Sequence, residues 1–221
     1  MSEFVPEIIR AERDLQGGVA LYFKEPVRGE DKDLSFSLIQ AGIAWPVRDK
    51  PGYVCIIGLL AGAKPCSPGS MMLIWEKEYS SYIDLTKEVL NKARDLRFLN
   101  FWTDRRHPDW SGFNFHFIQF ARSMGDIRLW HSPFAEDFQF GVDITQRWGN
   151  DRVIDLPANS ILLKQLLQMQ PSDLAGERPG EKFNAVNAYR LLVAAYEKVA
   201  MRTPEMMPRE SERVATPEGW A

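Results

Sequence analysis

Cysteine is scarce in this sequence, and the few cysteines present have no recognisable spacing. Among 221 residues there are two, Cys55 and Cys66. Cys55 lies within an apolar run, where a free thiol usually behaves as a small buried hydrophobe, and Cys66 lies in a segment rich in Pro, Gly and Ser. Such a pair argues against a disulfide framework and against a structural zinc site.

Long apolar runs and a signal sequence are also missing. No segment approaches the 18 or so consecutive apolar residues of a membrane-spanning helix, and the charged N-terminus contains no apolar signal core. We therefore expect no membrane partner, and a cytoplasmic protein is the default. The common catalytic signatures GxxxxGK[ST], GxSxG, HExxH and GxGxxG do not occur either.

An excess of positive charge is lacking as well. The formal net charge is -3 and the pI is about 5.7. Proteins that grip a nucleic-acid backbone usually show a basic surface. The whole-chain balance does not suggest one here, although a local basic patch stays open.

The composition is that of a globular protein. Hydrophobic residues make up 45%, charged residues 26% and aromatic residues 12% of the chain, with seven tryptophans. These values leave ample material for a core. The length favours one domain of α/β size, or one domain with an appendage.

Patterning predicts a mixed order of strands and helices. The apolar runs at 53–62 and 71–80, separated by a turn rich in Pro, Gly and Ser, predict an antiparallel hairpin. Helical spacing of apolar residues predicts a helix over 82–97, which Asp84 could cap, and a strand over 98–104 should follow it. We expect further helices at 112–124, from about residue 160 and at 183–201. A further strand is expected at 126–132.

The two ends of the chain are harder to interpret. Residues 1–49 have weak periodicity and are predicted to form an N-terminal arm or subdomain. Residues 50–201 form the predicted α/β domain. Residues 202–221 contain three prolines and no periodicity, and we expect a C-terminal tail.

The predicted order of elements resembles the ribonuclease H-like fold, a mixed sheet flanked by helices. More narrowly, it resembles the C-terminal nuclease domain of phage terminase large subunits, the motors that package DNA. The resemblance covers roughly residues 50–201. It rests on the element order, on the strand FLNFWTD that ends in Asp104, and on the run LPANSILLKQLLQMQ…GEKFNAVNAYRLLVAAYEK.

The resemblance implies a metal site made of acids from three elements. In that family, two or three carboxylates hold two Mg²⁺ or Mn²⁺ ions about 4 Å apart. Asp104 matches the middle acid. The acid of the first strand would fall near Leu60, and the acid of the closing helix near Asn184 or Asn187. Since none of these three is an acid, the resemblance implies a degenerate metal site.

Two alternatives for Asp104 stay open. A rebuilt site could recruit Glu76 and Glu78, which alternation places on one face of their strand, or His107 and Asp109 from the loop after Asp104. Alternatively, Asp104 only caps the end of a strand. The adjacent Arg105 and Arg106 could contact a phosphate, although arginines on loops are usually solvated.

Three functions follow from these observations. The first is a phage- or prophage-derived, terminase-nuclease-like protein that handles DNA without catalysis or with weak activity, and whose partners are DNA or packaging proteins. The second is an active nuclease with Mg²⁺ or Mn²⁺ at a rebuilt site. The third is a protein-interaction scaffold that kept only the fold.

Overall fold

A computed structural model describes nine stretches of the chain, which are residues 6–14, 17–29, 31–47, 50–104, 110–121, 127–135, 138–170, 172–173 and 182–201. Eight strands form one sheet: β1 Ile8–Arg13, β2 Val19–Phe23, β3 Asp33–Ala44, β4 Gly52–Leu60, β5 Met71–Tyr79, β6 Asn100–Thr103, β7 Arg128–His131 and β8 Ile154–Asp155. The helices are α1 Tyr82–Asp95, α2 Trp110–Ala121, the short 3₁₀ helix η1 Pro133–Ala135, α3 Phe138–Asn150, α4 Ile161–Gln168 and α6 Asn184–Met201.

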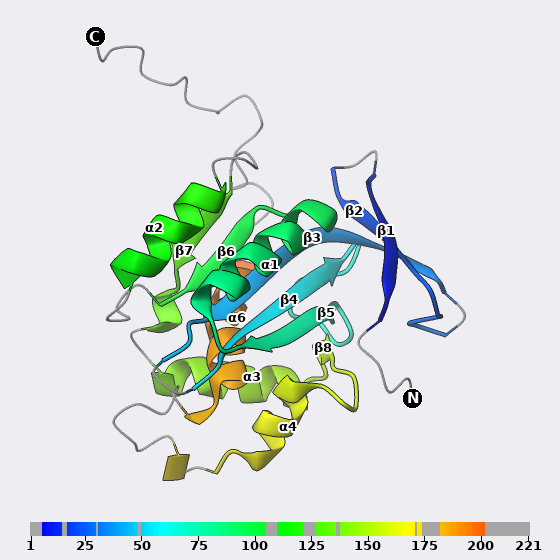
Figure 1. Ribbon diagram of the computed structural model, residues 1–221. Coiled ribbons are helices and arrows are strands. Elements are labelled where there is room, and N and C mark those ends of the chain that lie inside the picture. The colour runs from blue at the N-terminus through cyan, green and yellow to red at the C-terminus, as the bar shows by residue number, and fades with distance from the viewer. Residues whose placement is uncertain are drawn as a thin grey trace.

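The long strand β3 organises the sheet. One of its edges pairs antiparallel with β4, which in turn pairs antiparallel with β5. Its other edge is shared: the first half pairs antiparallel with β2, and the second half pairs parallel with β6. Strand β7 extends the sheet beyond β6 in the same direction, and β8 lies parallel to β5. The result is a mixed sheet flanked by helices, as the sequence predicts at this coarser level (Figure 1).

Helices cover both faces of this sheet. Helix α1 buries Leu85, Val89 and Ala93 in a core cluster that also contains Phe101 of β6 and Phe117 of α2. On the other face, α6 and α3 bury a second cluster against β4 and β5. Figure 1 shows α1 and α2 on one side of the sheet and α6 and α3 on the other. In the described part of the chain, no helix combines the length and the apolar character needed to cross a membrane.

The hairpin and the first helix form as local patterns predict. Strands β4 and β5 are joined by the Pro- and Gly-containing turn, and the predicted antiparallel pairing is confirmed. The N-cap of α1 is Ser81, whose Oγ accepts a hydrogen bond from the backbone N–H of Asp84 at 3.4 Å. Asp84 therefore lies in the first turn and is not the cap, although its charge still suits the helix N-terminus.

The predicted boundary at residues 49/50 needs correction. Strand β3 lies in the middle of the sheet and pairs with β4 over eight residue pairs, from Phe36↔Leu60 to Ala44↔Tyr53. Residues 33–44 therefore belong to the same sheet as residues 52–79, and β1 and β2 continue that sheet outward. The predicted tail, 202–221, lies outside the described residues.

Candidate functional site

Asp104 follows directly after β6, at the end of a strand in the interior of the sheet. Strand β6 lies between β3 and β7 and runs parallel to both. Thr103, the last residue of β6, is fully buried, and its Oγ1 donates a hydrogen bond to the carbonyl of Ile43 at 3.1 Å. Asp104 is half-buried and lies at the carboxyl end of β6, beside the parallel strand β7. The sequence predicted this position, an acid directly after a strand.

The strand beside β6 is β3, so the expected position of the first acid at Leu60 is wrong. Leu60 pairs with Phe36, near the start of β3, whereas Ala44 at its end pairs with Tyr53. Seven residues separate Leu60 from Tyr53 along β4, which corresponds to about 23 Å. The segment that flanks the end of β6 is Gln40–Ala44, and it also contains no acid.

Helix α6 closes the space above this segment. A Cβ built on Gly42 would lie 2.3 Å from the carbonyl oxygen of Ala188 and 2.9 Å from the Cβ of Leu192. Since any side chain at residue 42 would meet helix backbone, only glycine fits this close approach. On the same face of β3, the Gln40 side chain accepts a hydrogen bond from Trp102 Nε1. Neither position can supply a carboxylate to Asp104.

The two amides predicted for the closing helix have different surroundings. The Asn184 Nδ2 donates to Glu78 Oε1 at 3.1 Å and to the carbonyl of Pro51 at 2.9 Å. Its Oδ1 accepts from Gln165 Nε2 at 2.7 Å. Asn184 therefore ties the start of α6 to β5 and α4, on the side of the sheet away from β6.

Further along α6, the helix reaches the carboxyl ends of β6 and β7. Ser132, directly after β7, donates from its backbone N–H to the Thr103 carbonyl at 2.9 Å and from its Oγ to the Leu191 carbonyl at 2.8 Å. Asn187 lies one turn before Leu191 and is thus nearer to Asp104 than Asn184 is. The Asn187 Oδ1 is buried and accepts no hydrogen bond from a described residue.

Glu76 anchors a helix. Its carboxylate accepts hydrogen bonds from the backbone N–H groups of Ile161 at 2.8 Å and Leu162 at 3.1 Å, and from Ser160 Oγ at 3.1 Å. The Tyr53 hydroxyl donates to the same carboxylate. These contacts satisfy the free N–H groups in the first turn of α4 and place a negative charge at the positive end of its dipole.

The strand register keeps Glu76 and Glu78 away from Asp104. Glu76 pairs with Cys55, Cys55 pairs with Gly42, and Gly42 pairs with Trp102. Three strand spacings of about 4.8 Å place β5 about 14 Å from β6. Because two ions of one site lie about 4 Å apart, Glu76 and Glu78 cannot share a metal centre with Asp104. A rebuilt site from these two residues is wrong.

The described residues do not fit a two-metal centre. Within the described ranges, no three His, Cys, Asp or Glu side chains come close enough together to hold a metal ion. One carboxylate, with glycine and amide residues around it, is a poor donor set for two Mg²⁺ or Mn²⁺ ions, which need several oxygen ligands with negative charge. The other candidates, Arg105, Arg106, His107 and Asp109, lie outside the described residues.

An aromatic pair that the sequence did not single out lies beside Asp104. The rings of Trp102 and Trp130 stack with centroids 6.1 Å apart and an interplanar angle of 25°. Trp130 is 40% exposed, and its Nε1 donates to Asn100 Oδ1 at 3.0 Å. Arg128, two residues earlier on β7, is exposed on the same face. The sequence has no clear signal for this pair, because polar and apolar residues do not alternate in RLWH.

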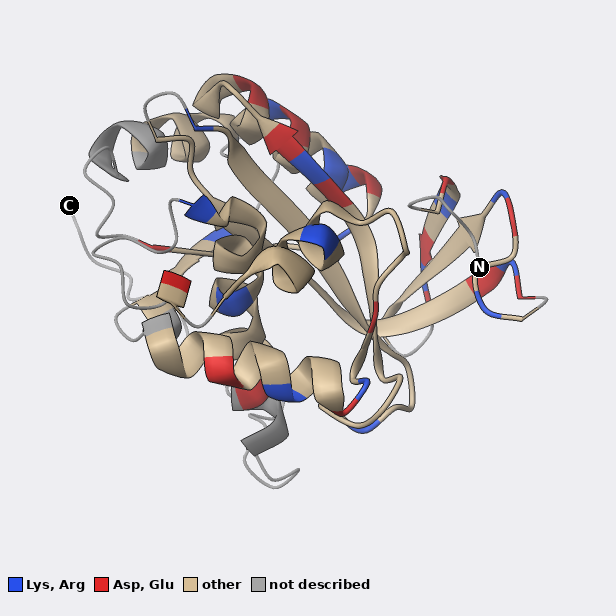
Figure 2. Ribbon diagram, turned by 90° about the horizontal axis from the view of Figure 1, so that it is seen from below, with Lys and Arg blue, Asp and Glu red and all other residues tan. Residues whose placement is uncertain are grey.

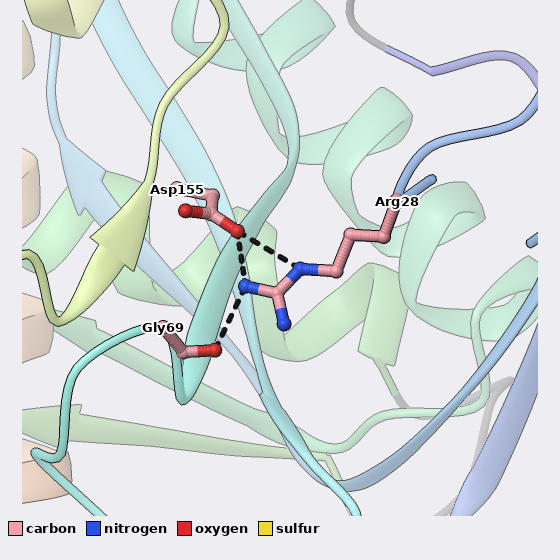
Figure 3. A network of polar contacts seen from close by, with 3 residues as sticks. All are labelled: Arg28, Gly69 and Asp155. Carbon is pink, nitrogen blue, oxygen red and sulfur yellow. Dashed lines mark hydrogen bonds and ion pairs between the residues drawn. The ribbon is translucent and has the colours of Figure 1, made fainter. Parts of the chain in front are cut away.

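A separate polar cluster joins the loop before β3 to β8. Arg28 donates from Nη2 to the Gly69 carbonyl at 2.8 Å, and from Nε to Asp155 Oδ2 at 2.9 Å (Figure 3). Arg28 and Asp155 border a cavity of about 960 Å³, to which α3 contributes polar residues such as Thr145 and α4 apolar residues such as Leu163. Since Arg28 also forms an ion pair with Asp155, the cluster holds the loop before β3 against the β4–β5 turn and against β8.

Comparisons with known proteins do not place this chain in a family. The chain matches no family model, and no curated protein matches it in sequence.

Proposed function

We propose that this chain has a ribonuclease H-like fold and is a phage- or prophage-derived, terminase-nuclease-like protein that handles DNA without catalysing its cleavage. The order of elements supports the fold. Three antiparallel strands, β3, β4 and β5, are followed by α1, the parallel strand β6, α2, the parallel strand β7 and the late helix α6. The resemblance in sequence covers residues 50–201 and takes β4 as the first strand of this order, whereas we take β3 as the first strand because it lies beside β6.

The close contact between Gly42 and α6 carries the proposal that cleavage has been lost. A nuclease of this type needs a carboxylate on the strand beside Asp104 to share its metal ions. At residue 42, the Ala188 carbonyl lies 2.3 Å from where a Cβ would be. The neighbouring Gln40 and Ala44 are an amide and a methyl side chain. The segment of β3 beside β6 therefore has no second acid, and the helix occupies the space at residue 42.

The surface near Asp104 supports contact with DNA. The exposed Trp130 stacks on Trp102, and the exposed Arg128 lies on the same strand face. An aromatic ring beside a cation is the arrangement that binds unstacked bases and the adjacent phosphates. This observation favours DNA handling over the alternative of an interaction scaffold that kept only the fold.

Two assays on the full chain test the proposal. Fluorescence anisotropy with labelled DNA should detect binding that weakens steeply between about 50 and 200 mM salt. A plasmid-cleavage assay with Mn²⁺ should give no cleavage with either the wild type or Asp104→Asn. The same assay with Mg²⁺ should give the same result.

Each opposite outcome selects an alternative. Cleavage by the wild type that disappears in Asp104→Asn would make the protein an active Mg²⁺- or Mn²⁺-dependent nuclease, with residues 105–109 as the source of further ligands. Absence of DNA binding even at low ionic strength would remove the DNA-handling function. A stable protein partner in pull-downs would then favour the scaffold.

A further inference from the structure

A basic pocket lies on the opposite face of the sheet from α6. It has a volume of about 760 Å³ and is bordered by α1, by the end of β1 and by the residues that lead into β6 and β7. Among the described residues that line it, the cations are Arg13, Lys87, Arg94 and Arg97, and none is Asp or Glu. Figure 2 shows that charged residues gather on α1 and on the β1–β2 hairpin, while the middle of the sheet carries few.

Within the described part of the chain, the cations of this pocket have few carboxylate partners. Among the described residues, Arg13, Lys87 and Arg97 have no carboxylate within ion-pair distance, and Arg94 has only a 3.6 Å contact with its neighbour Asp95. All four residues are exposed. In a chain with a net charge of -3, four clustered cations, of which only Arg94 has an acid partner among the described residues, create a local positive potential that attracts anions.

A role in stabilising the fold explains the presence of only some of these four cations. Arg94 in the last turn of α1 suits the negative end of the helix dipole. Arg97, in left-handed conformation at φ 56°, donates from Nε to the Ala11 carbonyl at 3.2 Å and so holds β1 against the end of α1. Lys87 lies in the middle of α1, and Arg13 comes from β1. Among the described residues, neither of these two side chains has a hydrogen bond or an ion pair with the rest of the fold.

The floor of the pocket is apolar. Phe98 and Leu90 are buried beneath it, the Phe120 ring lies 5.9 Å from Lys87 Nζ, and Leu99 at its edge is 38% exposed. A cationic rim around an apolar floor fits a phosphate group that is attached to a flat, apolar body. A nucleotide unit of a single strand has this chemistry, whereas a duplex keeps its bases stacked inside and offers mainly phosphates.

We propose that this pocket binds the phosphates of a single nucleic-acid strand, with an unstacked base or sugar against its apolar floor. The pocket lies before the start of β6, whereas Asp104 lies after its end. Five residues separate Leu99 from Asp104, which corresponds to about 17 Å along the strand. The inference rests on the proposed DNA-handling function and adds a second contact surface to it, remote from the Asp104 site.

The test compares two double variants that remove the same charge. Lys87→Gln with Arg94→Gln neutralises two cations at the pocket, and Lys32→Gln with Lys164→Gln neutralises two exposed lysines elsewhere. Both variants and the wild type are titrated with a fluorescein-labelled oligothymidylate of about 20 nucleotides, longer than one binding module spans. Urea unfolding of each variant checks that the fold is kept.

The pocket variant should bind more weakly and with a smaller salt dependence. Each phosphate contact to a single strand contributes about 0.7 to the slope of log Kobs against log salt, so two lost contacts should lower the slope by about 1.4. At 0.1 M salt this corresponds to roughly 25-fold weaker binding, taking 1 M salt as the reference. The control variant should keep the wild-type slope and affinity.

Other outcomes overturn the inference in distinguishable ways. If the wild type binds the strand and the pocket variant matches the control variant, the pocket is not the site, while the proposed function stands. If a duplex of matched length binds more tightly than the strand with the same dependence on Lys87 and Arg94, a single strand is the wrong ligand. If tripolyphosphate displaces the strand at an equal concentration of phosphate, the site takes free phosphate. If the wild type binds no nucleic acid at all, the proposed function fails as well.

Discussion

Replacing Gly42 by alanine tests the contact that closes the site at the end of β6. The added Cβ would lie 2.3 Å from the Ala188 carbonyl, whereas ordinary van der Waals contact begins at 3.4 Å, so α6 must move by 3.4 − 2.3, or 1.1 Å. Overpacking of this kind costs about 1–3 kcal/mol, and the upper end applies because the obstacle is backbone. Alanine restricts the unfolded chain more than glycine, which returns about 0.5–1 kcal/mol.

The expected net loss is therefore about 2 kcal/mol in the free energy of unfolding. Urea titration followed by tryptophan fluorescence and far-UV circular dichroism measures it. Gly149→Ala in α3 is the matched control: its Cβ would meet nothing within 4 Å, so the better helix propensity of alanine should stabilise the protein by about 0.5–1 kcal/mol. Equal stability of Gly42→Ala and the wild type would refute the reasoning that α6 occupies the place of an acid.

Three further predictions concern groups away from Asp104. Glu76→Gln should lower the free energy of unfolding by about 2 kcal/mol, because the charged acceptor at the start of α4 is lost. The control Glu7→Gln changes an exposed carboxylate and should leave the urea midpoint unchanged. Equal effects of the two substitutions would contradict the role of Glu76. Burial first, and then the neighbouring Cys55 and Glu76, raise the pKa of Tyr53 well above 10.0. Its contribution to stability is therefore complete below about pH 10 and is lost as the pH rises further, by about 1.4 kcal/mol per pH unit. Urea unfolding between about pH 8 and 11 should show a shallower alkaline decline in Tyr53→Phe than in the wild type, and parallel curves would count against this assignment. Burial raises the pKa of the Cys66 thiol to about 12, so Cys66 should react with a maleimide far more slowly at pH 8 than free cysteine does, and an equal rate would show that the thiol is not shielded.

Local patterns in the sequence were sufficient for the elements that lie next to one another in the chain. The apolar runs around a Pro- and Gly-containing turn determine the β4–β5 hairpin, because pairing there needs only a short loop. Leucine and valine at helical spacing determine α1, and the same reading places Asp104 at the end of β6. The sequence alone also shows that Leu60, Asn184 and Asn187, at the positions expected for metal-binding acids, are not acids.

Helix α3 was missed, although its sequence contains a signal. Glycines and β-branched residues in the segment 134–153 lower its helix propensity. Buried Val142, Thr145 and Trp148 nevertheless recur at helical spacing. Packing of this stripe against α6 outweighs the weak propensity, as it does in most short helices of globular proteins.

The strand that lies beside Asp104 was decided only by the tertiary structure. The two halves of β3 have different surroundings: Asp33–Ser37 is mostly exposed and pairs with β2, whereas the segment after it is buried between helices on both faces and pairs with β6. A strand covered on one face alternates, and a strand covered on both faces is apolar throughout. The first half of β3 is of the one-faced kind and the second half of the two-faced kind, so its sequence has no single period. Its place beside β6 depends on contacts between segments about 60 residues apart in the chain.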